Sequence, residues 1–176
     1  MPEQDKFKNP AKLAREFLKQ YLQEGHLPRV PPKLPPEYRE QAGVFVSLKK
    51  GGQLRGCIGT VQPVRDNLAE EIAANAVSAA VRDPRFPPVG EEELDSLDVS
   101  VDVLSPMEKV ESKMDLDPKK YGVMIRSGSR SGLLLPDLEG INTVDEQLEI
   151  AMRKAGIDGN EPLQLYRFKV TRYTEK

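Results

Sequence analysis

Hydrophobic and polar residues alternate along this chain with two different periods, which predicts a mixture of helices and strands. Residues 10–24 place hydrophobic side chains every three or four positions. The residue before this segment is an asparagine, which can cap a helix, and its first residue is a proline, which a first helical turn tolerates. We therefore expect an N-terminal helix over residues 9–24. Five prolines between residues 26 and 42 exclude a helix or a central strand there, so we expect an extended Pro-rich surface loop.

The rest of the pattern repeats one order of elements. Residues 43–60 alternate around a Lys-Gly-Gly turn and predict a β-hairpin, followed by a helix over 66–81 and a strand rich in valine. Residues 122–135 predict a second hairpin, and a capping box at 143–146 begins a helix that leads to one final strand. The acidic run at 91–98, EEELDSLD, is expected to form a solvated face.

This repetition predicts an α+β fold with mostly antiparallel strands. The first hairpin–helix–strand unit spans about 43–104 and the second about 122–172, and each is too small to bury its strands alone. Both begin with similar tetrapeptides, GVFV at 43–46 and GVMI at 122–125, although a match this short also arises by chance. If the units are duplicates, Cys57 corresponds approximately to Leu133.

Composition is that of a globular domain rather than a disordered chain, with 38% hydrophobic and 31% charged residues. No hydrophobic run approaches the roughly 20 residues that cross a bilayer, and the N-terminus lacks the apolar stretch of a signal peptide. The single cysteine cannot form an internal disulfide, which fits a reducing compartment. We therefore expect a cytoplasmic protein without membrane contact.

Charge and ligand types limit the chemistry further. The net charge of −2 lacks the basic excess of a non-specific nucleic-acid binder, so nucleic acid is disfavoured as a partner. One histidine and one cysteine cannot build a Cys/His zinc site, and the sequence has neither a GxGxxG nor a GxxxxGK motif. We expect no metal site and no cofactor.

The stretch LRGCIGT at residues 54–60 holds the cysteine between two glycines. Side chains on a strand alternate between faces, which pairs Leu54 with Ile58 on one face and Arg55 with Cys57 on the other. Burying Cys57 would also bury the Arg55 charge, so we expect Leu54 and Ile58 in the core and Cys57 facing away from it. A β-bulge within the stretch would break this alternation.

Two interpretations of Cys57 stay open on these residues alone. In one, Arg55 favours the thiolate, and backbone amides of the Gly-rich turn stabilise a bound negative charge. In the other, cysteine is a small packing residue and the glycines only shape a bend. A catalytic pair with the only histidine, His26, has no support from the sequence because the Pro-rich loop imposes no geometry.

Four further segments follow LRGCIGT in order: AANAVSAAV, DPRFPPV, SVDVLSP and GLLLP. Together they resemble the AMMECR domain family over roughly residues 10–173. The resemblance implies one AMMECR-like domain over residues 1–176, built of two interlocked lobes with LRGCIG near the cleft between them. It also implies a suspected functional site in that cleft, without a settled activity.

The resulting hypothesis is an uncharacterised AMMECR-family protein with a site around Cys57 and Arg55. Cys57 is the expected nucleophile or thiol ligand, and the expected binding residues are Arg55, Gly56, Gly59, Asp83 and Arg85. Within that set the arginines would bind an anion or stabilise the thiolate, and the glycines would shape the backbone. The protein would then be a thiol-dependent enzyme or the substrate-binding partner of an enzyme.

The alternative is a non-catalytic interaction or regulatory module in which LRGCIG is structural. The Pro-rich loop would then be a candidate docking surface for a partner. Bacterial and archaeal relatives in the family include protein A of the AmmeMemoRadiSam system, so the resemblance implies Memo-like and radical SAM proteins as candidate partners.

Overall fold

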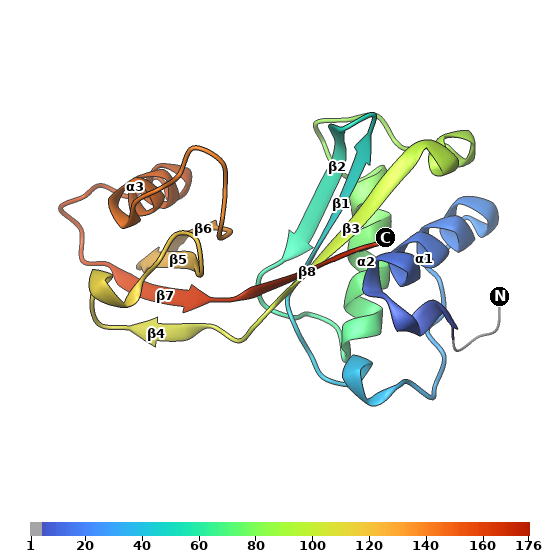
Figure 1. The fold of residues 1–176 in the computed structure, drawn as a ribbon, viewed down its shortest axis with the longest axis horizontal. Coiled ribbons are helices and arrows are strands. Elements are labelled where there is room, and N and C mark those ends of the chain that lie inside the picture. The colour runs from blue at the N-terminus through green and yellow to red at the C-terminus, as the bar shows by residue number, and fades with distance from the viewer. Residues whose placement is uncertain (1–4) are drawn as a thin grey trace. The chain divides into compact units, whose positions relative to one another are not determined.

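Two four-stranded sheets organise the chain, and each sheet has its own hydrophobic core (Figure 1). The structure is a computed structural model that describes residues 5–176. Its contacts define a first unit of residues up to 104 together with 171–176, and a second unit of residues 105–170. The predicted α+β class with mostly antiparallel strands is confirmed.

The first unit has the strand order β2-β1-β3-β8. Its elements are the 3₁₀-helix η1 (Asp5–Lys8), α1 (Pro10–Glu24), η2 (Pro36–Tyr38), β1 (Val44–Lys50), β2 (Gln53–Thr60), α2 (Leu68–Val81), η3 (Glu91–Ser96), β3 (Leu97–Leu104) and β8 (Val170–Thr174). The helices α1 and α2 lie on one side of strands β1 and β3 (Figure 1). The buried side chains of β1, Val44, Val46 and Leu48, point toward these helices and form the centre of the first core.

The start of α1 follows the sequence prediction closely. The side chain of Asn9 accepts the backbone N–H of Ala11 at 2.8 Å, and Pro10 occupies the first turn, where no backbone donor is needed. Gly25 ends the helix with φ of +78°, a conformation that glycine adopts without strain.

The Pro-rich segment after α1 differs from the prediction at one place. Residues 36–38 form the short helix η2, which begins with a proline because a first helical position needs no N–H. The turn directs the Tyr38 ring inward, where it is 2% exposed and packs edge-on against Phe7. The segment is therefore partly anchored in the core rather than extended over the surface throughout.

The hairpin of β1 and β2 contains a β-bulge at Arg55. Leu48 pairs with Gly56, but the next residue of β1, Lys49, pairs with Leu54, so Arg55 is an extra residue. The bulge shifts the alternation at the start of β2, so Leu54 is 40% exposed instead of buried as predicted. Ile58 does pack against the first core, as expected.

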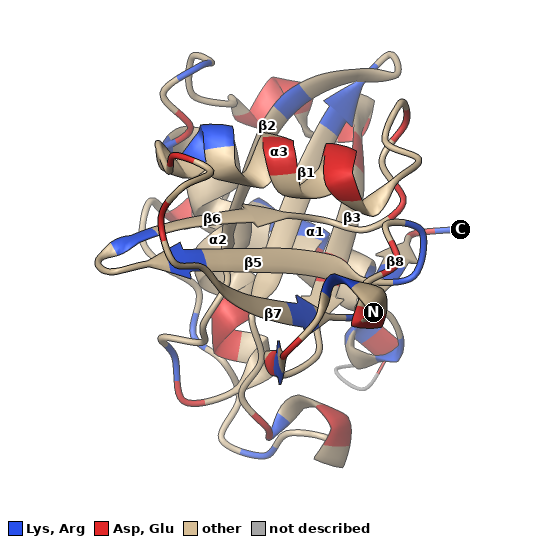
Figure 2. Ribbon diagram, turned by 90° about the vertical axis from the view of Figure 1, so that its left-hand side faces the viewer, with Lys and Arg blue, Asp and Glu red and all other residues tan. Residues whose placement is uncertain are grey.

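The second unit has the strand order β4-β7-β5-β6. Its elements are β4 (Glu108–Val110), η4 (Lys113–Asp115), β5 (Gly122–Ser127), β6 (Arg130–Leu134), α3 (Val144–Ala155) and β7 (Gln164–Phe168). Figure 2 shows α3 beside β6 and β5. Thr143 caps α3, with acidic residues in the first turn and basic residues in the last, which suits the helix dipole.

The two units repeat the same pairing of hairpin and following strand. In each, the first hairpin strand lies between the second hairpin strand and the strand that comes after the helix: β2-β1-β3 and β6-β5-β7. Gly56 of β2 and Gly132 of β6 occupy the same place, because an added Cβ would lie 2.1 Å from the Ala79 oxygen or 2.2 Å from the Ala151 oxygen of the covering helix. This match makes Leu133 the counterpart of Cys57, as expected from the sequence.

The similar tetrapeptides do not occupy equivalent positions. Counting back from each hairpin turn, Leu48 matches Ile125, whereas the sequence match aligned Val46 with Ile125. The bulge residue Arg55 has no counterpart in the second hairpin. The strand pairing is therefore the better guide to the correspondence between units than the tetrapeptides.

The predicted final strand is two strands that belong to different sheets. β7 pairs with β5, and β8 is the neighbour of β3. Between them the N–H of Lys169 donates to the Ser105 hydroxyl at 2.7 Å, and its carbonyl accepts the Ser105 N–H at 2.9 Å. These bonds to a residue distant in the sequence interrupt the ladder, and hydrophobic alternation alone could not indicate them.

The contact between glycine and helix predicts that Gly56→Ala lowers the free energy of unfolding of the first unit by about 1–3 kcal/mol. The reason is that the new methyl group would overlap a backbone oxygen, which cannot move without shifting α2. Urea denaturation followed by circular dichroism measures the loss. Gly159→Ala is the control, since its Cβ would meet nothing within 4 Å. Equal midpoints for the Gly56→Ala and Gly159→Ala variants would show that β2 and α2 are not packed this closely.

Candidate functional site

Cys57 lies on the face of the first sheet that points away from α1 and α2. Its neighbours Gly56 and Ile58 face α2 and the core, so the thiol between them points to the opposite side. The side chain is half-buried, and its Sγ lies 3.2 Å from the Ser47 hydroxyl oxygen on β1. The strand geometry therefore agrees with the predicted orientation of Cys57. Leu54, predicted to lie in the core with Ile58, is instead 40% exposed.

A row of polar side chains crosses the sheet from Cys57. Ser47 is paired with Cys57 on one side and with Ser100 of β3 on the other. Two residues along β3, the buried Asp102 accepts two hydrogen bonds from the Arg172 guanidinium of β8 at 2.7 and 2.8 Å. We call this surface, defined by Cys57, Ser47, Ser100 and the Asp102–Arg172 pair, the polar face.

Sequence reasoning missed Ser47, Ser100 and Asp102. The signal was present, because each alternates with valines or leucines that point into the core. Polar residues at every second position predict a face away from the core, but only strand pairing reveals that they lie beside Cys57.

The backbone of Cys57 is held by the loop that follows α2. The Asp83 carboxylate accepts the Cys57 N–H at 3.0 Å, and the Arg85 guanidinium donates to the Cys57 carbonyl at 3.4 Å. The N–H and the carbonyl of Cys57 both point outward from the edge strand β2. The loop therefore satisfies backbone groups that would otherwise be open to another strand. The two segments singled out in the sequence, LRGCIG and DPRF, thus form one structure.

Asp83 and Arg85 also bind each other. Arg85 Nε and Nη2 donate to the two Asp83 oxygens at 3.0 and 2.8 Å, while Asp83 itself is only 4% exposed. The Arg85 guanidinium, assisted by the backbone N–H groups of Cys57 and Arg85, holds the pKa of the Asp83 carboxyl well below its usual range. Asp83 in turn raises the pKa of Arg85.

Arg55 has a different set of partners from those expected. Its Nε and Nη2 donate to Glu93 at 3.2 and 3.1 Å, and its Nη1 donates to the Pro87 carbonyl at 2.8 Å. Lys50 also reaches Glu93, at 3.1 Å. The bulge thus directs Arg55 to the segment between α2 and β3, where it fixes that segment to the hairpin.

The acidic run at 91–98 is therefore not only a solvated face. Glu93 forms the ion pair with Arg55, and Leu94 is buried in the first core. The Arg55 guanidinium, followed by the Gly90 N–H and the Lys50 ammonium, lowers the pKa of Glu93 to about 2. The 3₁₀-helix η3 accounts for this, because it turns one side of the run toward the protein.

The predicted binding glycines both approach atoms of the protein itself. Gly56 lies against α2, and a Cβ on Gly59 would lie 2.3 Å from the Phe45 ring. The close approach that glycine permits is thus used for packing at both positions.

His26 does not accompany Cys57. Its Nε2 lies 3.3 Å from Glu24, and its ring lines a pocket together with Tyr21 and Val77 of the helices. That pocket is on the helix side of the sheet, whereas Cys57 faces the other way. The catalytic pair considered from the sequence is therefore not supported.

Within residues 5–176, no three histidine, cysteine, aspartate or glutamate side chains gather in a way that could hold a metal ion. No helix in the same range has both the length and the hydrophobicity required to cross a membrane.

The fold and this site define a class of α+β proteins in which a DPRF loop closes the edge of a strand bearing LRGCIG. The chain belongs to the AMMECR1 family, which matches residues 11–176. The recognised resemblance is thereby confirmed.

Relatives and a solved structure extend this result. A protein of Thermotoga maritima is 50% identical over 165 residues, covering 92% of this chain and 95% of its own length. The protein CA_C1420 of Clostridium acetobutylicum is 55% identical over 166 residues, which are 93% of this chain but 35% of that protein. The uncharacterized protein PH0010 of Pyrococcus horikoshii has a similar structure, with a TM-score of 0.84, 34% identity and coverage of 95% and 90% of the two chains. These three names state no activity.

The Arg55–Glu93 pair predicts a specific acid sensitivity. The folded-state pKa of Glu93, about 2, lies below its ordinary value of 4.5, so the pair stabilises fully above that value and is lost as pH falls toward 2. Glu93→Gln should lower stability at pH 7 by about 1–3 kcal/mol and remove the part of the acid loss that Glu93 causes. Urea denaturation at pH 7, 4.5, 3 and 2 measures both effects.

The control is Glu92→Gln, which changes an exposed carboxylate that has no ion pair within residues 5–176. It should keep the stability of the wild type at pH 7 and the same loss toward low pH. If the Glu93→Gln variant retained the full acid loss, the pair would not be the source of it.

Proposed function

We propose that this protein is a binding protein that contacts its ligand through the polar face, with Cys57 as a contact group rather than a nucleophile. It would serve as the substrate-binding partner of an enzyme. The observation that carries the proposal is the position of the thiol, half-buried on the polar face with the Ser47 hydroxyl 3.2 Å away. A free thiol of this kind also suits a reducing compartment, and we propose the cytoplasm.

The surroundings of the thiol support contact more than catalysis. A cysteine nucleophile ordinarily needs a base to take its proton, and a serine hydroxyl cannot serve as one at neutral pH. Within residues 5–176 the thiol sulfur has no hydrogen-bonding side chain other than Ser47. The rigid backbone around Cys57 instead favours a fixed surface that a partner recognises.

A macromolecular partner is favoured by the length of the Clostridium relative. The segment similar to this chain is 35% of that protein, so there it is joined to a much longer remainder. Joining two modules in one chain raises their effective concentration and favours their contact. The family association from the sequence offers Memo-like and radical SAM proteins as the partners to test first.

A thiol-dependent enzyme is the second candidate function. The observation that favours it is Arg85, a fixed positive charge that bonds to the Cys57 carbonyl at 3.4 Å. A guanidinium at this place can bind an anionic substrate. In this candidate Cys57 would react directly with the substrate, with Arg85 and Asp83 holding its backbone.

One experiment separates these two functions, because the chain has a single cysteine that N-ethylmaleimide can modify selectively. Purified Memo-like and radical SAM proteins from the same organism are titrated calorimetrically into untreated, modified and Cys57→Ala protein. We expect at least one partner to bind, the adduct to weaken binding at least about tenfold, and Cys57→Ala to retain affinity within about threefold.

The matched control is Cys57→Ala treated with the same reagent, which should bind as the untreated variant does. No binding of either protein, or a folded thiol that the reagent cannot reach, would contradict a binding role for the polar face. Loss of pathway activity in cells carrying Cys57→Ala, with partner binding intact, would favour the enzyme instead.

A further inference from the structure

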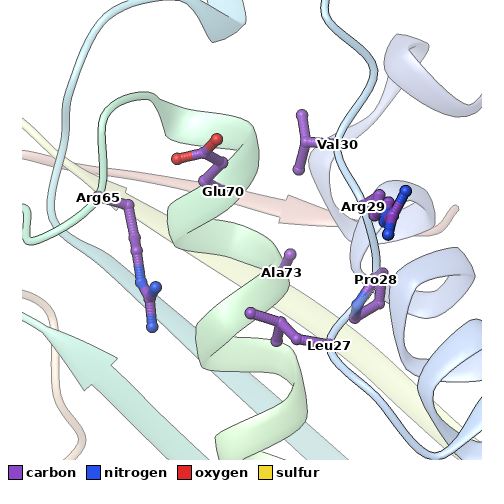
Figure 3. Close-up of a pocket in the computed structure, with 7 residues that line it drawn as sticks. All are labelled: Leu27, Pro28, Arg29, Val30, Arg65, Glu70 and Ala73. Carbon is purple, nitrogen blue, oxygen red and sulfur yellow. The ribbon is translucent and has the colours of Figure 1, made fainter.

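A second candidate site lies on the helix side of the first unit. Two adjoining pockets of about 390 and 270 Å³ follow α2, and both are lined by Leu27 and Arg65. We call them together the arginine groove. Figure 3 shows its larger part, between the segment 27–30 after α1 and the first turns of α2.

Cationic side chains gather in this groove. Arg29 and Arg65 line the larger pocket, and Arg65, Arg82 and His26 line the smaller one. Within residues 5–176, Arg29, Arg65 and Arg82 have no carboxylate within 4 Å. The same holds for Arg39 and Arg126, whereas every other arginine forms an ion pair. Arg65 and Arg82 therefore line one pocket together without an internal anion, whereas in Figure 3 the guanidinium groups of Arg29 and Arg65 lie on opposite sides of α2.

Two acidic residues also belong to the surroundings. Glu24 lies 3.3 Å from His26 and so engages the imidazole rather than an arginine. Glu70 lines the larger pocket, but in Figure 3 its carboxylate and the Arg65 guanidinium point in different directions along α2. Arg65 also lines the smaller pocket, which Arg82 lines as well and Glu70 does not.

The backbone fixes two of the arginines in place. The N–H of Arg65 donates to the buried Glu71 carboxylate at 2.8 Å, and its carbonyl accepts from Gln41 at 2.8 Å. Arg82 follows the last turn of α2 and donates its N–H to the Ser78 carbonyl at 2.9 Å. Anchored backbones hold the two Cα positions in place, so that binding a common ligand does not have to order the backbone there.

We propose that the arginine groove binds an organic phosphate of metabolite size. Guanidinium groups match the geometry of phosphate oxygens and bind them in pairs. The apolar side chains of Leu27, Ala74 and Val77 line the smaller pocket beside the charges and offer contact to the organic part. The pocket volumes fall near the lower end of the range common for small-molecule sites.

The test titrates three probes, inorganic phosphate, pyrophosphate and ADP, into the full chain at low ionic strength. Calorimetry measures the affinity, and the melting temperature is followed as a second readout, because a ligand that binds only the folded state raises it. We expect ADP or pyrophosphate to bind more tightly than phosphate. Arg65→Gln and Arg82→Gln should each weaken that binding at least about tenfold, as should high salt.

Lys12→Gln is the matched control, since it removes one exposed charge at the opposite end of α1. It should leave the affinity of the probes unchanged. Arg82 adjoins the buried Asp83, so the Arg82→Gln variant alone would not separate lost binding from a disturbed fold. Arg65 does not adjoin Asp83, and the Arg65→Gln variant therefore serves as the second test. No heat and no rise in melting temperature with any probe up to about 5 mM would overturn the proposal. An equal loss of affinity in the Lys12→Gln variant would also overturn it.

Discussion

The contact between the Asp83 carboxylate and the Cys57 N–H is the constraint on which the candidate site depends. Cys57 lies on the edge strand β2, whose outward backbone groups would otherwise be free to pair with another strand. Because Asp83 is buried, its charge requires the Arg85 guanidinium, which in turn reaches the Cys57 carbonyl. One ion pair therefore closes the sheet edge and fixes the backbone that presents the thiol.

The elements of the fold could largely be predicted from the sequence because each carries a local signal. Asn9 with Pro10, and Thr143, start helices where their side chains can accept backbone N–H groups. The Gly51-Gly52 turn takes positive φ at both positions, which only a glycine-rich hairpin turn supplies readily. The break between β7 and β8 had no such signal, because it depends on the bonds of Lys169 to Ser105, which is distant in the sequence.

The candidate site could be located from the sequence but its contacts could not be assigned. Alternation on the strand indicated which way Cys57 points, yet the bulge moved Arg55 out of that pattern and into the pair with Glu93. A bulge depends on how two strands pair, and Ser47 and Ser100 join Cys57 only through that pairing. Both facts lie beyond any local pattern, because they are properties of the sheet rather than of one strand.

Comparison of the two units separates the structural part of the site from the part that remains to be explained. In the second unit the counterpart of Cys57 is Leu133, whose carbonyl accepts from the Lys154 ammonium at 3.0 Å. A basic side chain that bonds this carbonyl is thus common to both sheet edges, and in the second unit it serves a residue without reactive chemistry. Edge closure therefore explains the position of Arg85. What the first unit has in addition is the sulfur itself, together with the polar row beside it. The proposed binding role therefore rests on the side chain of Cys57 and the polar face, rather than on the arginines that support them.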